Sequence, residues 1–236
     1  VRGQEASVRA LLNMASCKEA TAMLVAERGL VEAVAVLLES GRRSAREDAA
    51  RVLSVMVGHG RSAATEIGGN AEVVGSLVGS IAKAQDDEGE VRLWCVSALH
   101  GLSRLPALRQ GLAERGLEDG LVRLLATTEV EVGEWAEAIH ALATMALCNV
   151  SGLRADTPLL QHRPHVRSLV HVMAMGMTTG EYGRFRFRCG HVLGALQALA
   201  SHEPLRKDLV GAKLLELSMD MVAVAEARSR GQGIVG

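Results

Sequence analysis

Ala146-Leu147-Cys148-Asn149-Val150-Ser151 is the stretch that decides the fold, because close variants of it recur along the chain. In each variant, apolar residues lead to one small or polar residue, as at the end of an amphipathic helix. The comparable positions are Asn13, Ser54, Gly101, Asn149 and Ala198, which are spaced by 41, 47, 48 and 49 residues. This period predicts a chain of repeated helical units.

A second sequence anchor supports the repeat. Glu27-Arg28-Gly29-Leu30 returns unchanged as Glu114-Arg115-Gly116-Leu117, 87 residues later, which is about two units. The stretches around the two copies align without a gap, and each copy is followed by a Leu-Leu pair. Because polar positions match as well as apolar ones, shared helix periodicity explains the likeness poorly.

The composition favours helices packed on helices. Of the 236 residues, 48% are hydrophobic but only 2% are aromatic, so Ala, Leu, Val and Met must fill the interior. Small and straight-chain side chains suit closely packed helices, whereas sheets prefer aromatic and β-branched ones. The formal net charge of −1 argues against a nucleic-acid-binding protein, which needs a basic surface.

The cysteines indicate a cellular compartment, and the motifs indicate a class of function. Cys17, Cys95, Cys148 and Cys189 are spread singly, which predicts free thiols in a reducing, cytoplasmic compartment. No phosphate loop, nucleophile–base pair or zinc-ligand spacing is visible, so we expect no cofactor, no metal and no enzymatic activity. The chain lacks an initiator Met and a polar cap, so we expect a segment of a longer protein.

Apolar periodicity predicts helices over residues 19–26, 31–39, 44–57, 71–83, 90–104, 133–150, 165–177, 184–200 and 214–226, a further helix through Leu125 and a short one beginning at Pro204. Ser44, followed by Glu47, is expected to cap its helix. Bends are expected at Gly29, at Gly68-Gly69-Asn70 and at Gly116. The predicted units are 1–26 (partial), 27–68, 69–113, 114–162, 163–210 and a partial unit to 226, followed by a frayed tail over 227–236.

A short helix, a glycine bend, a medium helix and a long helix in each unit resemble the armadillo repeat. The run from Cys17 to Leu38 is similar to the stretch between successive repeats, and Leu12-Asn13-Met14-Ala15 and Leu147–Ser151 are similar to its Leu-x-Asn-Leu-Ala/Ser motif. The likeness covers residues 1–225 and implies an all-α, right-handed α-solenoid. The HEAT repeat is the nearest competitor, but the glycine bends favour armadillo.

The resemblance also implies a binding mode, in which the third helices line a concave groove. Adjacent helices lie about 8–10 Å apart and an extended peptide advances about 3.3 Å per residue, so each repeat spans two to three ligand residues. An Asn amide can pair with one peptide unit. The predicted groove residues are Asn13, Ser54, His100, Gly101, Asn149 and Gln197.

Two alternatives stay open for these residues. Asn13 and Asn149 either clamp a ligand or satisfy backbone groups at their own helix ends. Trp94 and Trp135 belong either to the core or to the groove. No Trp lies one turn before either Asn, so importin-like binding of nuclear signals is not expected.

A basic patch is predicted at Arg184, Arg186 and Arg188, where Arg alternates with Phe. The patch is interpreted as a solvated helix start, as a site for an acidic partner, or as a phosphate or RNA contact. For the whole chain we predict a non-catalytic protein-interaction module, a scaffold or adaptor. The alternatives are a structural subunit of a cytoskeletal or ciliary assembly and a myosin-chaperone-like armadillo domain.

Overall fold

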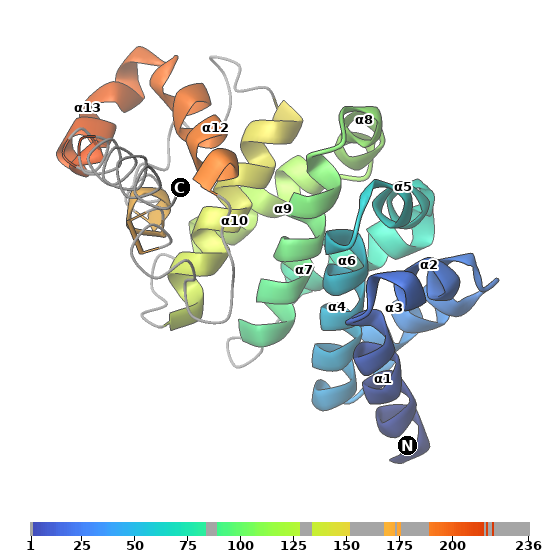
Figure 1. Ribbon diagram of the computed structural model, residues 1–236. Helices are drawn as coiled ribbons and strands as arrows, with labels where there is room; N and C mark the ends of the chain where they lie inside the picture. Colours follow the sequence, from blue (N-terminus) through green and yellow to red (C-terminus); the bar gives the residue numbers. More distant parts are fainter. Residues whose placement is uncertain are drawn as a thin grey trace, which may run out of the picture.

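The computed structural model describes residues 2–83, 89–127, 134–151, 168–172, 174–175, 189–214, 216 and 219. Every regular element within these ranges is an α-helix, as the composition predicts (Figure 1). None of the described helices is long and apolar enough to span a membrane.

The described helices are grouped in threes along the chain. Helix α1 (Arg2–Ala15) comes first, and three triplets follow, each made of two shorter helices and a longer third one. Their bounds are α2 (Lys18–Ala26), α3 (Leu30–Ser40), α4 (Arg43–Gly58), α5 (Arg61–Gly69), α6 (Ala71–Lys83), α7 (Gly89–Ser103), α8 (Pro106–Glu114), α9 (Leu117–Thr127) and α10 (Glu134–Ser151). Two more helices are α12 (Cys189–Ala200) and α13 (Glu203–Gly211).

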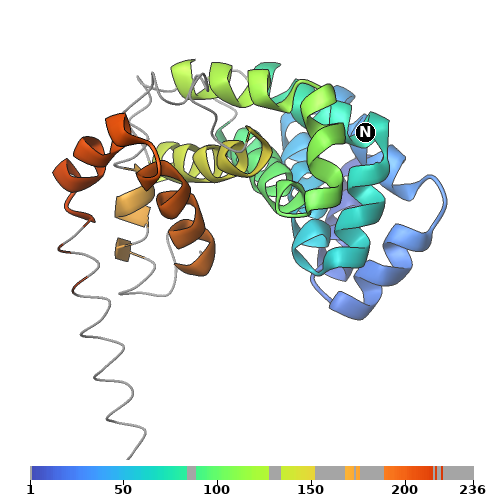
Figure 2. The same cartoon turned by 90° about the horizontal axis from the view of Figure 1, so that it is seen from above.

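Equivalent helices of successive triplets stack side by side. The third helices form one row in the order α1, α4, α7, α10 and α12, and the second helices form another in the order α3, α6 and α9. The first helices α2, α5 and α8 form a third row. Figure 2 shows the rows following an arc from the N-terminal helices to α12 and α13. The result is a solenoid, in which each unit contacts its neighbours.

One hydrophobic core runs through the stack, from Val8 in α1 to Leu209 in α13. Each third helix contributes fully buried aliphatic residues, such as Leu53 in α4, Leu99 in α7 and Leu147 in α10. Small residues allow the helices to approach closely: a methyl group added at Gly101 would lie 2.5 Å from Cγ1 of Val57 on α4.

Two of the three predicted glycine bends are confirmed. Gly29 and Gly116 precede the second helices of their triplets with φ of 79° and 75°, the left-handed region that glycine tolerates best. The third bend, predicted over Gly68-Gly69-Asn70, lies at Asn70, because Gly68 and Gly69 belong to α5. Asn70 ends that helix instead, and its Oδ1 accepts hydrogen bonds from the N–H groups of Glu72 and Val73 at 3.1 and 3.2 Å.

Ser44 is not the N-cap of its helix. Helix α4 begins one residue earlier, after Arg42, and no side chain caps it. The Ser44 hydroxyl donates instead to Oε1 of Glu5 on α1, at 3.1 Å. A tertiary partner has therefore replaced the local cap.

The periodicity also missed two helices, α5 and α8. Each has nine residues, and α8 carries a helix-start signal in Pro106 at its first turn that was not used. The armadillo resemblance implied a short helix in each unit without fixing its bounds. The predicted tail over 227–236 lies outside the described residues.

Candidate protein-binding face

One stripe on α4 and one on α7 consist of half-buried or exposed residues, apart from Ser54, which is buried. The stripes consist of Glu47, Arg51, Ser54 and Gly58 on α4, and of Glu90, Trp94, Ser97 and Gly101 on α7. Both follow the i, i+4, i+7, i+11 spacing of a single helical face. We call these residues the third-helix face.

Two contacts join the stripes into one surface. The guanidinium carbon of Arg51 lies 5.1 Å from the centroid of the Trp94 ring, within the range of a cation–π interaction. The Ser54 hydroxyl donates to Oγ of Ser97 at 2.9 Å. Each contact joins residues 43 positions apart, so the third-helix face continues from α4 to α7 without a break.

Arg51 retains its hydrogen-bonding capacity. The acidic neighbours Glu47 and Asp48 are paired with other arginines, Arg43 and Arg9, each at 3.0 Å. Within the described part of the chain, Arg51 makes the contact with Trp94 and no hydrogen bond or ion pair. The ring therefore orients a guanidinium whose N–H groups are available to a ligand.

The contacts change which residues of successive third helices lie opposite one another. Ser54 and Gly101 were taken as equivalent positions, but Ser54 faces Ser97, and Gly101 approaches Val57. The residues of α4 opposite Gly101 therefore lie about one turn beyond Ser54. Apolar positions in a helix repeat every three or four residues, so a slip of one turn leaves the sequence pattern almost unchanged.

Asn149 links α10 to α7. Its Nδ2 donates to Oγ of Ser103 at 3.1 Å, and the buried Ser103 hydroxyl donates in turn to the carbonyl of His100 at 2.8 Å. Within the described residues, Oδ1 and the second N–H of Asn149 have no hydrogen-bond partner. The half-buried amide is thus oriented by one bond and keeps one donor and one acceptor for a ligand.

Serine hydroxyls satisfy backbone groups at the helix ends, which is the role considered as an alternative for Asn13 and Asn149. The hydroxyls of Ser16, Ser151 and Ser201 each donate to the carbonyl four residues earlier, at 3.0, 2.8 and 3.1 Å, and so satisfy the ends of α1, α10 and α12. Asn149 bonds the neighbouring helix rather than its own backbone. Asn13 is exposed on α1 and bonds no described residue.

The other predicted groove residues differ in accessibility. Gln197 is exposed on α12, whereas His100 is buried beside Gly101. Ser54, Gly101 and Asn149 therefore lie on successive third helices, but Ser54 is as buried as His100. Arg184, Arg186 and Arg188 lie outside the described residues.

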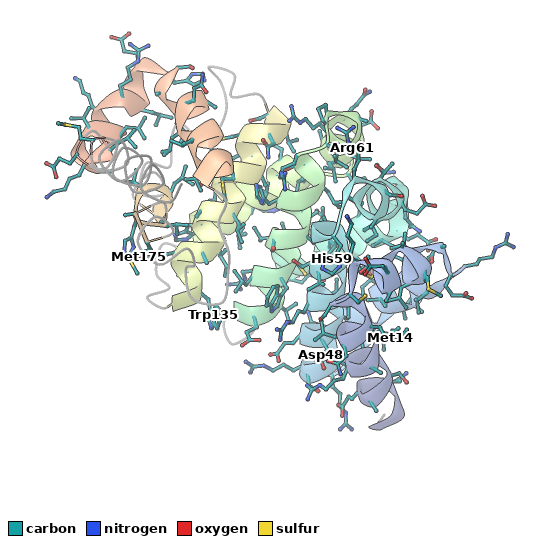
Figure 3. All side chains as sticks on the ribbon, in the orientation of Figure 1. Met14, Asp48, His59, Arg61, Trp135 and Met175 are labelled. Carbon is teal, nitrogen blue, oxygen red and sulfur yellow. The ribbon has the colours of Figure 1, made fainter. Side chains whose placement is uncertain are left out.

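Both tryptophans are half-buried and pack against the core. Trp94 also belongs to the third-helix face, where Arg51 covers its ring. Trp135 lies at the N-terminal end of α10, next to Gly89 at the start of α7 (Figure 3). Trp94 therefore packs against the core, and whether it also contacts a partner stays a prediction.

Cys148 is next to Asn149, and its chemistry is set by its surroundings. Burial raises the pKa of the Cys148 thiol to about 12, so it stays protonated and unreactive near neutral pH. Within the described ranges, no group of three or more His, Cys, Asp and Glu side chains could hold a metal ion. The polar chemistry at this position is hydrogen bonding by the Asn149 amide.

Sequence reasoning missed Arg51, Ser97 and Ser103, although they orient the candidate site. For Arg51 a signal existed, because it precedes Trp94 by 43 residues, close to one repeat. Ser97 and Ser103 carry no distinguishing pattern.

The fold of this chain resembles that of several solved structures. No family model and no curated protein matches the chain. The crystal structure of an engineered protein matches with a TM-score of 0.57 and 22% identity, covering 92% of this chain and 82% of the other.

Two further matches specify the kind of solenoid. A designed armadillo repeat protein matches with a TM-score of 0.52 and 21% identity, covering 90% of this chain and 92% of the other. Another, in complex with the peptide (KR)4, matches with a TM-score of 0.50 and 20% identity over 90% and 91%. This chain therefore has the armadillo-repeat fold that the sequence resemblance predicts.

Proposed function

We propose that this chain is a non-catalytic protein-interaction module that holds an extended segment of a partner protein along its third helices. The carrying observation is the oriented but incompletely paired amide of Asn149, one helix along from the third-helix face. The complex of a designed armadillo protein with a peptide supports the mode of binding. The free thiols of Cys17, Cys95 and Cys148 fit a scaffold or adaptor in the reducing cytoplasm.

The repeat geometry suits a strand-like ligand. Third helices packed about 8–10 Å apart meet an extended chain every two to three residues. Asn149 would pair its remaining N–H and Oδ1 with one peptide unit of the ligand. Two helices away, Arg51 stacked on Trp94 would contact a ligand carbonyl or side chain, and the exposed Gly58 would admit the ligand backbone.

The test uses peptides selected for binding to this chain. Phage-displayed peptides of about 12 residues, which would span four or five repeats, would be panned against the protein. The affinity of the best binder is then measured by fluorescence anisotropy for the wild type and for Asn149→Ala. We expect the substitution to weaken binding about tenfold, the equivalent of about 1.4 kcal/mol in lost hydrogen bonds.

Ser103→Ala is the matched control, because it removes the internal bond of Asn149 but leaves the amide in place. It is expected to lower stability while changing affinity far less than Asn149→Ala does. Equal affinity of the wild type and Asn149→Ala would refute the clamp. Binding that depends instead on an exposed residue away from this face, such as Met23 on α2, would place the ligand elsewhere.

A further inference from the structure

Arg51 places a positive charge on the third-helix face that no carboxylate of the described chain neutralises. Its guanidinium lies over the Trp94 ring, on the neighbouring third helix. A cation–π contact holds a guanidinium in place without a hydrogen bond, so the N–H donors of Arg51 are left for a ligand.

A hydroxyl donor lies next to this cation, where α4 and α7 run side by side (Figure 1). Ser54 follows Arg51 by three residues, and Ser97 follows Trp94 by three, so each serine shares a helical face with the residue before it. Ser54 donates to Ser97 at 2.9 Å, and neither hydroxyl bonds any other described residue. The hydrogen of the half-buried Ser97 hydroxyl therefore remains for a ligand.

These donors suit a carboxylate. A planar guanidinium binds both oxygens of an Asp or Glu side chain, and such charge-assisted bonds are stronger than neutral ones. A ligand Lys or Arg would meet the charge of Arg51 on the ring face that otherwise attracts cations, and would be repelled. A phosphate group favours several cations, but Arg43 and Arg9 are already paired with Glu47 and Asp48.

Glu90 disfavours one direction of approach to the site. It lies one turn before Trp94 on α7, whereas Ser97 lies about one turn after it. A carboxylate on the Glu90 side would meet a like charge, and on the serine side it would meet donors. The favoured position is therefore between the Arg51 guanidinium and the Ser97 hydroxyl.

We propose that the partner segment held along the third helices carries an Asp or Glu side chain, and that its carboxylate binds the Arg51 guanidinium and the Ser97 hydroxyl. This assignment rests on the proposed function and adds the chemistry of one ligand position. Arg51 then selects acidic segments over basic ones, and Trp94 acts by orienting Arg51.

Two libraries of phage-displayed peptides, each of about 12 residues, provide the test. The acidic library allows Asp and Glu but excludes Lys and Arg, and the basic library follows the reverse rule. Both are panned against the 236-residue chain, and fluorescence anisotropy measures the affinity of the best binder from each. We expect the acidic library to give the tighter binders, with Asp or Glu recurring at one peptide position.

Arg51→Met removes the charge but keeps a long side chain over Trp94. It is expected to weaken the best acidic peptide about tenfold, because a hydrogen-bonded ion pair is lost. Replacing the recurrent acidic residue of the peptide by its amide should have the same effect, and both changes together should cost no more than either alone. Arg61→Met is the matched control, because it makes the same charge change at an exposed position on α5, and it should leave the affinity unchanged.

Circular dichroism would verify that both variants keep the wild-type helix content. If Arg51→Met does not fold, Arg51→Lys serves in its place: it keeps the charge but lacks the planar fork, and it should still weaken the acidic peptide severalfold. Acidic binders that do not depend on Arg51, or tighter binders from the basic library, would overturn the acidic ligand and leave the binding module standing. If neither library yields a binder, the proposed function fails, and the acidic ligand fails with it.

Discussion

Gly101 is a residue at which two third helices pack closely. A methyl group there would overlap Val57 at 2.5 Å, inside any van der Waals contact. We expect Gly101→Ala to destabilise the protein by about 1–3 kcal/mol through overpacking, despite the better helix propensity of alanine. Urea denaturation measures the change in unfolding free energy.

Gly75→Ala on α6 is the matched control, because no heavy atom lies within 4 Å of the added methyl group. This variant is expected to gain about 0.5–1 kcal/mol, the ordinary benefit of replacing glycine within a helix. Combining Gly101→Ala with Val57→Ala should recover part of the loss. A stabilising effect of Gly101→Ala alone would mean that the two helices can separate freely.

At the residue scale, the sequence located the repeating positions better than their contacts. Gly29 and Gly116 were predictable because a left-handed bend selects glycine almost uniquely. The partner of Asn149 was not, because Ser103 lies 46 residues away and a serine carries no pattern of its own. The one-turn slip at Ser54 has the same origin, since helical periodicity does not distinguish successive turns.

At the element scale, Asn70 serves two helices. Its Oδ1 caps α6, and its Nδ2 donates to Oε1 of Glu32 on α3 at 2.6 Å. We expect Asn70→Ala to cost about 2 kcal/mol, about half from the cap and half from the bond to Glu32. Asn70→Ser, which can still cap the helix, is expected to cost about half as much.

Thermal and urea denaturation of the two variants would separate these contributions. Equal losses for Ala and Ser would show that the bond to Glu32 carries the whole effect. Asn70 stands where a glycine precedes α3 and α9. Its side chain caps the following helix, so this boundary needs no left-handed glycine.

At the scale of the whole molecule, the structure is a set of nearest-neighbour contacts. Leu99 lies at the centre of α7 and is fully buried, so Leu99→Ala is expected to cost about 2–5 kcal/mol. In hydrogen exchange followed by mass spectrometry, we expect protection to fall most in α7 and its neighbours α4 and α10, and least in α13. Uniform loss along the chain would indicate that the solenoid unfolds as a single cooperative unit.

The fold was the most predictable property at this scale, because repetition multiplies a weak signal. One Leu-x-Asn segment is uninformative, but five comparable positions together with the repeated Glu-Arg-Gly-Leu motif define the architecture. The surface chemistry was less predictable. It depends on which residues of adjacent helices meet, as Arg51 and Trp94 do, and those pairs arise only when the rows assemble.

The buried hydroxyl of Thr21 is hydrogen-bonded to the ring of His59, which lies 38 residues further along the sequence. It lies 2.9 Å from the carbonyl of Ala15, 3.1 Å from that of Cys17 and 2.9 Å from Nδ1 of His59. A hydroxyl has one hydrogen to donate, and the carbonyls can only accept it. When the Thr21 hydroxyl donates to either carbonyl, Nδ1 of His59 supplies the hydrogen of the third bond, and neutral His59 is then the Nδ1–H tautomer.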